Sequence, residues 1–109
     1  MTSQTVLIPL SVKMIYESES TDAPYVAYAP ELDISSCGAS EREARKHLAD
    51  AVNILFEEAS RKGKLDELLE DAGYRKKQQS WIAPMISFQQ VSVHLKQMSH
   101  AQNFSYSLS

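Results

Sequence analysis

Hydrophobic and polar residues alternate regularly near the start of the chain. Between Thr5 and Tyr16 six apolar side chains share one parity: Val6, Ile8, Leu10, Val12, Met14 and Tyr16. A period of two over this length predicts a β-strand. Pro9 has no backbone N–H, so we expect this strand at the edge of a sheet or with a bulge near its start.

Two shorter apolar runs follow a polar, acidic loop over residues 17–24. The first spans residues 25–29 and ends at Pro30, and the second spans residues 32–37 and ends at Gly38. Proline and glycine favour a tight corner and a turn at these points. The pattern therefore predicts three consecutive strands with short links, an antiparallel meander.

The period then changes to that of an α-helix. Ser40 and Glu43 match the S-x-x-E capping box, in which each side chain accepts a hydrogen bond from a free backbone N–H of the first turn. The apolar residues that follow form one stripe, as in a helix that lies on a sheet: Ala44, Leu48, Ala51, Val52, Leu55, Phe56 and Ala59. Gly63 can supply a left-handed cap, and Leu65 to Ala72 predicts a second, shorter helix.

The remaining residues predict a loop, a strand and a tail. Tyr74 to Pro84 reads as a loop that carries the only tryptophan, Trp81. Ile86 to Leu95 alternates with a slip in parity that a bulge at residues 89–90 would reconcile, so a fourth strand is expected. Residues 96–109 lack periodicity and predict a flexible tail. We therefore expect one α+β domain over residues 1–95, with the order βββααβ.

Length and composition restrict the class of protein. At 109 residues the chain suffices for one domain with its own core. Its single cysteine, Cys37, cannot form an internal disulfide, which is typical of a reducing cytoplasm. The N-terminus lacks a basic region, and no apolar run approaches the length of a membrane span, so neither a signal peptide nor a transmembrane segment is expected.

Charge is distributed unevenly along the chain. Residues 1–71 contain 14 acidic and 7 basic residues, a balance of −7, whereas residues 72–109 contain 4 basic and no acidic ones. Such a surface can simply be solvated, or it can suit a basic partner. It is poorly suited to a phosphate backbone, so the sequence argues against nucleic-acid binding by the main body.

The middle of the chain resembles the HicB-like family of small antitoxins. The resemblance rests on the aromatic run Tyr25–Ala29 before Pro-Glu-Leu-Asp, on the turn at residues 38–40, and on Glu43-Ala44 followed by Leu48. It implies a partial ribonuclease-H-like fold and a binding function. Such antitoxins bind a small basic HicA-like toxin that cleaves messenger RNA, and they cover its active site. Fuller members add a DNA-binding domain, but the residues after Leu95 have no amphipathic period, so no autonomous DNA binding is expected.

No group of residues predicts catalysis. A metal-dependent nuclease needs carboxylates that converge, and helical spacing places Glu43 and Asp50 on the solvent side, away from Asp33 on the sheet. His47 is expected to pair with Glu43 at the surface, and Cys37 to be a small buried strand residue. We therefore expect no enzyme activity, no cofactor and no metal.

Candidate partner-binding residues lie on the solvent side of the two predicted helices and near the turn: Glu57, Glu58, Glu67 and Glu70, with Asp33 and Arg45 as further candidates. Arg45 falls inside the edge of the apolar stripe, so either its stem lies along the sheet or its guanidinium is offered to a partner carboxylate. A homodimer that covers the exposed edge is also expected. Two other functions stay open: a regulatory or ligand-sensing homodimeric module, and an orphan HicB-like protein without a toxin.

Overall fold

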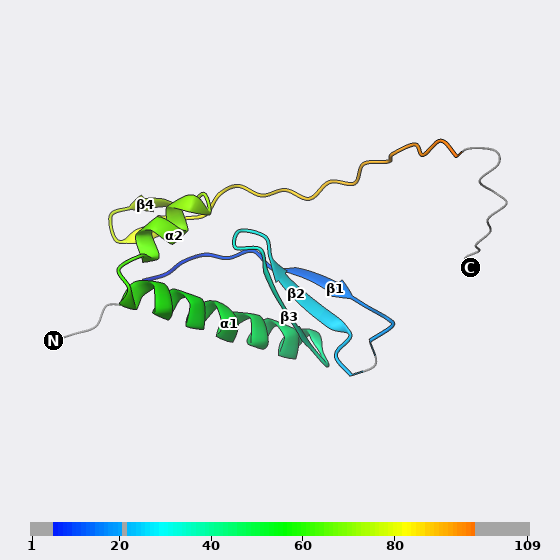
Figure 1. The fold of residues 1–109 in the computed structure, drawn as a ribbon, viewed down its shortest axis with the longest axis horizontal. Helices are drawn as coiled ribbons and strands as arrows, with labels where there is room; N and C mark the ends of the chain where they lie inside the picture. Colours follow the sequence, from blue (N-terminus) through cyan, green and yellow to red (C-terminus); the bar gives the residue numbers. More distant parts are fainter. Residues whose placement is uncertain (1–5, 21, 98–109) are drawn as a thin grey trace.

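The computed structural model describes residues 6–20 and 22–97 and has an α+β architecture (Figure 1). A three-stranded antiparallel sheet packs against one long helix, and a short helix packs beside a two-stranded hairpin. The elements are β1 (Lys13–Tyr16), β2 (Tyr25–Ala29), β3 (Ile34–Gly38), α1 (Glu41–Arg61), α2 (Leu65–Asp71), β4 (Arg75–Lys77) and β5 (Ser80–Ile82). None of the described helices combines the length and the apolar character needed to cross a membrane.

The predicted meander is confirmed, with the strand order β1-β2-β3 and β1 at an edge. The first strand is much shorter than expected, because residues 6–12 are not part of the ladder and Thr5 lies outside the described residues. The backbone N–H of Ser11 donates instead to Oε2 of Glu31, at 2.9 Å. Glu31 is only 8% exposed. A buried carboxylate from the β2–β3 corner therefore takes the place of a strand partner in this segment.

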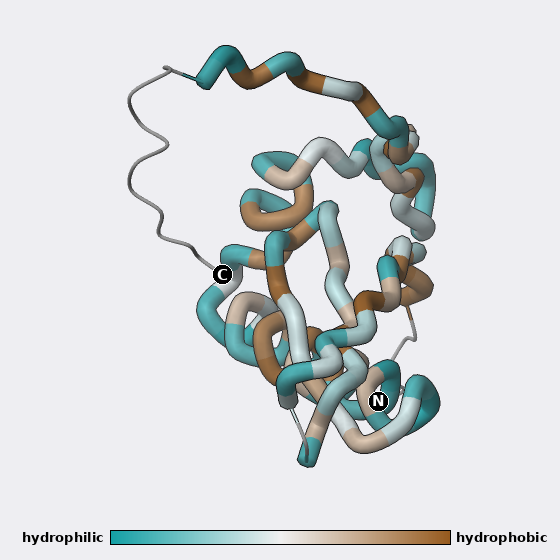
Figure 2. The backbone as a smooth tube through the Cα atoms, turned by 90° about the vertical axis from the view of Figure 1, so that its right-hand side faces the viewer, coloured by the Kyte–Doolittle hydropathy of each residue, from teal (hydrophilic) through white to brown (hydrophobic). Residues whose placement is uncertain are grey.

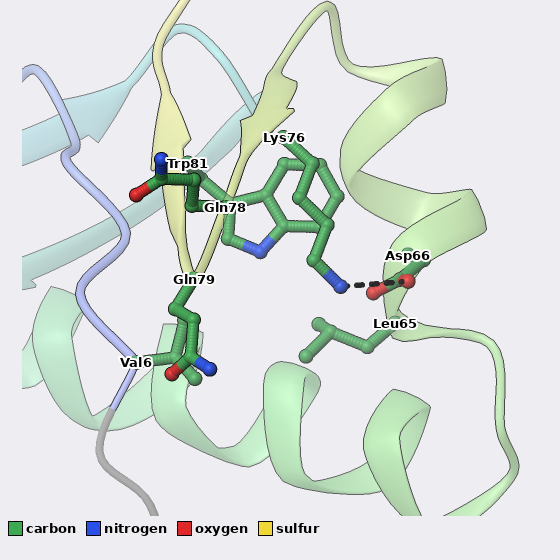
Figure 3. Close-up of a pocket in the computed structure, with 7 residues that line it drawn as sticks. All are labelled: Val6, Leu65, Asp66, Lys76, Gln78, Gln79 and Trp81. Atoms are coloured by element: carbon green, nitrogen blue, oxygen red, sulfur yellow. Dashed lines mark hydrogen bonds and ion pairs between the residues drawn. The ribbon is translucent and has the colours of Figure 1, made fainter.

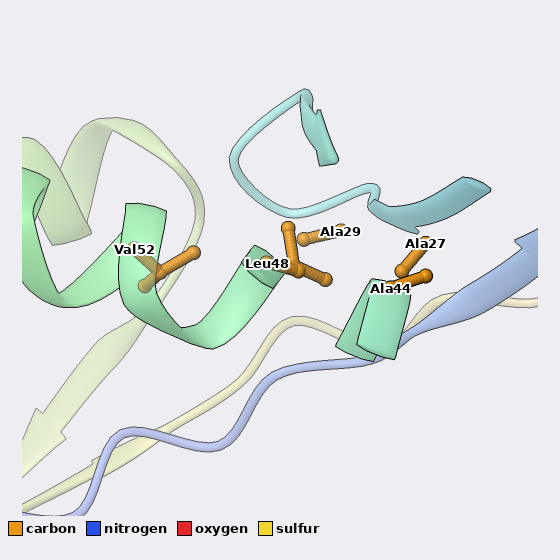
Figure 4. Packing of buried hydrophobic residues seen from close by; sticks show 5 residues of the cluster. All are labelled: Ala27, Ala29, Ala44, Leu48 and Val52. Carbon is orange, nitrogen blue, oxygen red and sulfur yellow. The ribbon is translucent and has the colours of Figure 1, made fainter. Parts of the chain in front are cut away.

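The main core lies between the sheet and α1, and it is built from small side chains on the sheet (Figure 4). Ala27 and Ala29 of β2 are fully buried against Ala44, Leu48 and Val52 of α1. Small residues on the strand allow the helix to approach closely. The expected apolar stripe is therefore confirmed at its centre.

Gly38 is needed at the closest approach between sheet and helix. A Cβ placed there would lie 2.5 Å from the backbone nitrogen of Ala44. The capping box is confirmed at the same place: Ser40 Oγ accepts from the N–H of Glu43 at 3.1 Å, and Glu43 Oε1 accepts from the N–H of Ala39 at 2.8 Å. The strand end and the helix start thus form one compact turn.

A second core joins α2 to the hairpin, where the sequence predicted only a loop. Leu69, Tyr74 and Trp81 are buried together, and β4 and β5 are joined by a two-residue turn in which Gln78 has φ 57°. The hydroxyl of Tyr74 donates to the carbonyl oxygen of Pro9 at 2.6 Å. Burial, together with the charge of Glu31, raises the pKa of Tyr74 to about 12. This cluster fastens the N-terminal segment to the rest of the fold.

The prediction of a fourth strand over residues 86–95 is wrong, because these residues do not pair with the sheet of their own chain. Residues 85–97, here called the arm, are extended but belong to no strand, and they run away from α2 past the sheet (Figure 1). The element order is therefore βββααββ among the described residues. The alternation that suggested a strand is present, and apolar positions recur along the arm (Figure 2). Residues 98–109 of the predicted tail lie outside the described part.

Candidate functional site

The short helix α2 carries an unusual amount of negative charge, which extends to its C-terminal end. Four of its seven residues are acidic and exposed: Asp66, Glu67, Glu70 and Asp71. Its last turn contains no basic residue. The helix dipole is negative at that end and disfavours carboxylates there, so Glu70 and Asp71 destabilise the helix that holds them.

Ion pairs divide these four acids into two groups. Asp66 pairs with Lys76 of the hairpin at 3.4 Å, and Glu67 pairs with Lys64 at 3.7 Å. Within residues 6–20 and 22–97, neither Glu70 nor Asp71 takes part in an ion pair. The charge at the dipole-negative end is therefore left uncompensated by the described chain.

A hollow of about 310 Å³ lies on this helix. Lys64, Glu67, Leu68 and Asp71 line it. Its wall combines one half-buried apolar side chain with two carboxylates at the rim. An aliphatic stem with a cationic end, as in lysine or arginine, fits such a mixed surface.

The two acidic candidates on α1 differ from one another. Glu58 is engaged by Arg61 and, at 3.5 Å, by Lys62. Glu57 lies about 100° further round the helix, is exposed, and forms no ion pair among the described residues. It borders a hollow of about 420 Å³ beside Phe56. Glu57 is thus available to a partner, whereas Glu58 already pairs with Arg61 and Lys62 at the end of its own helix.

Asp33 and Arg45 each interact with a partner within the described chain. Asp33 adopts φ 56° at the β2–β3 corner and accepts a hydrogen bond from the Tyr28 hydroxyl at 2.9 Å, which raises the pKa of Tyr28. Arg45 is exposed and pairs with Glu41 at 3.9 Å. It precedes Glu57 by 12 positions, about 18 Å along the helix axis.

Two expectations about reactive side chains are wrong. Cys37 is exposed, not buried. His47 does not pair with Glu43, because its Nδ1–H donates to the carbonyl oxygen of Cys37 at 2.7 Å. Asp50 pairs with Lys46 at 3.1 Å. No set of three or more metal-ligating side chains converges anywhere in the described ranges.

A further hollow of about 230 Å³ lies between the hairpin, α2 and the N-terminal segment (Figure 3). The Trp81 ring forms one wall with the Lys76 ammonium 5.6 Å from its centroid, and the amides of Gln78 and Gln79 lie at the hairpin turn. The Lys76–Asp66 pair crosses the space (Figure 3). Sequence reasoning missed this site because it placed Trp81 in an irregular loop.

Comparison of the chain with known proteins gives no match to a family model, to a curated protein or to a solved structure.

Proposed function

We propose that this protein is a HicB-like antitoxin, which binds a small, basic, messenger-RNA-cleaving protein in the cytoplasm and covers its active site. The observation that carries the proposal is the uncompensated charge at the end of α2. Glu70 and Asp71 stand at the dipole-negative terminus without an ion pair in the described chain. A basic partner would supply the missing positive charge.

Energetics support a partner at this place. A carboxylate at a helix C-terminus costs about 0.3–1 kcal/mol, so the free protein is less stable than it could be. Cations from a partner would reverse the sign of that interaction. The hollow beside Leu68 can receive the stem of one such side chain, with Glu67 and Asp71 at its rim.

The proposed mechanism is occlusion without chemistry on the partner's substrate. Charges at the rim of an interface act chiefly on the rate of encounter. Glu57 extends the acidic surface onto α1 and would assist this encounter, while Glu58 contributes less because Arg61 and Lys62 already pair with it. Asp33 and Arg45 are already engaged, by the Tyr28 hydroxyl and by Glu41, and are assigned no part in this encounter.

A second function, as a regulatory module that senses a small ligand, is favoured by the hollow at the hairpin. An aromatic wall, two amides and an ion pair could bind a small polar molecule there. Its volume of about 230 Å³ is below that of usual ligand sites, which begin near about 300 Å³. The antitoxin proposal is therefore preferred.

The test is whether a short basic reading frame adjoins the gene and, if one does, how fast its product associates with this protein. Glu70→Lys with Asp71→Lys should slow association about tenfold at low salt, and the difference should shrink as salt is added. Glu17→Lys with Glu19→Lys, in the β1–β2 loop, makes the same change of net charge away from α2. Equal slowing by both pairs would mean that only net charge matters, and no slowing by either would overturn the proposed surface.

A further inference from the structure

Exposed apolar side chains are concentrated in two segments of the described chain. Ten of the twelve large hydrophobic residues that are exposed lie in residues 6–16 or in the arm. The first segment contributes Val6, Leu7, Val12, Ile15 and Tyr16. The arm contributes Met85, Phe88, Val91, Val93 and Leu95. Exposure on this scale in two extended segments indicates that each lacks a partner.

The first segment includes a strand with a free edge. The Glu17 N–H donates to the Pro24 carbonyl oxygen at 2.7 Å, and the pairing continues as Tyr16↔Tyr25 and Ile15↔Val26. Hydrogen-bonded and non-hydrogen-bonded pairs alternate in an antiparallel ladder. Met14 and Tyr16 therefore direct their N–H and C=O groups away from β2, towards the outer edge of the sheet.

The arm has the complementary character of a strand without a sheet. It is extended, its apolar residues alternate over 91–95, and it follows Pro84, which lies 3.3 Å from the position of a Cβ on Gly73. Further along the chain the arm passes β1, where the Lys13 ammonium lies 5.1 Å from the Phe88 ring centroid. No ladder forms there in the single chain.

We propose that the arm of one copy adds as a strand to the free β1 edge of a second copy, and that the two copies exchange arms. The arm and β1 of one chain run in the same direction (Figure 1). A two-fold axis perpendicular to that direction reverses the second copy's β1, so each arm meets its new neighbour antiparallel. The exchange extends each antiparallel sheet by one strand and covers the edge of β1.

Self-complementarity favours a second copy over a different protein. The arm and the edge lie on one chain, as an isologous two-fold interface requires. Each copy would contribute the arm and the segment 6–16, on the order of 20 residues a side, which is the size of a stable interface. Docking of the arm on its own β1 would instead give a parallel pair, which is less stable per residue.

The test compares two arm variants of the full chain by sedimentation velocity across a wide range of concentration. Val93 is 86% exposed in the single chain, so Val93→Asp should leave the fold intact, which far-UV circular dichroism checks. Each dimer would bury two such carboxylates, so its dissociation constant should rise about a hundredfold. Ser92→Asp has the opposite parity and should change it by no more than about twofold.

Amide hydrogen exchange provides the second measurement on the unaltered chain. Arm amides and those of Met14 and Tyr16 should be protected together and lose protection on dilution. A strict monomer at all concentrations, equal effects of the two variants, or protection that does not depend on concentration would each overturn the proposal. The last result would indicate docking on the chain's own edge. The association of two copies is largely apolar, so its dissociation constant should change little with salt. Binding of the basic partner should weaken as salt is added, so the failure of one proposal can be told from the failure of the other.

Discussion

Reversing the charges at the end of α2 should make the free protein more stable while it weakens partner binding. The double variant Glu70→Lys with Asp71→Lys places cations where the helix dipole favours them. Each carboxylate there costs about 0.3–1 kcal/mol, and each lysine gains about as much. Because both positions are exposed and screened, we expect the low part of that range, a gain of about 1–2 kcal/mol in the free energy of unfolding.

Glu67→Lys is the matched control, because Glu67 lies in the first turn of the same helix, where a carboxylate is favoured. It also pairs with Lys64, so this reversal should destabilise the protein by about 0.5–1 kcal/mol. Urea denaturation followed by circular dichroism and Trp81 fluorescence measures both, at low and at high salt. A less stable double variant, or the same sign for both reversals, would refute the assignment of the dipole as the cause.

Three further outcomes follow from the packing. Gly38→Ala inserts a methyl group into the first turn of α1 and should cost about 1–3 kcal/mol, whereas Gly63→Ala, with φ 68° and open space around it, should cost about 1 kcal/mol from backbone strain alone; denaturation curves rank the two. Leu48→Ala should cost about 2–5 kcal/mol through a cavity and Ser40→Ala about 1 kcal/mol through the lost cap, and the reverse order would mean that α1 is placed wrongly. The pKa of Tyr74 is raised to about 12 from an ordinary value of 10, so its contribution to stability is complete below pH 10 and is lost as the pH rises to 12; Tyr74→Phe should show a smaller fall over that interval in a pH series of thermal unfolding.

Local patterns were sufficient for the elements whose stabilising contacts are local. The capped helix could be predicted because Ser40, Glu43 and the apolar stripe lie within a few turns of each other. The meander could be predicted from short apolar runs bounded by Pro30 and Gly38. In both cases the residues that determine the element are its own or its immediate neighbours.

Elements that depend on distant residues were missed. The first strand loses residues 6–12 because Glu31, 20 positions after Ser11, takes a backbone donor. The β4–β5 hairpin contains neither strict alternation nor a glycine turn, and it is held by the burial of Trp81 against α2. The arm has the pattern of a strand but no partner in its own chain, and alternation alone cannot reveal which edge a strand will join.

The exposure of the candidate acids on the two helices was predicted, because solvent-side positions follow from helical spacing. The sequence predicts only some of the ion pairs that these acids form. The spacing of Glu58 from Arg61 and Lys62 allows an i,i+3 and an i,i+4 pair. The Asp66–Lys76 pair requires the hairpin to fold back on α2, so no pattern within one element could indicate it.

The proposed function is the neutralisation of a basic, RNA-cleaving partner by covering its active site. It is tested by the cleavage of a messenger RNA by the purified product of any short basic reading frame that adjoins the gene, with increasing amounts of the full chain. Cleavage should stop at a fixed stoichiometry, and the α2 double reversal should shift the inhibition to higher concentration. Undiminished cleavage in the presence of excess protein, or an adjacent product that neither cleaves RNA nor binds this chain, would contradict it.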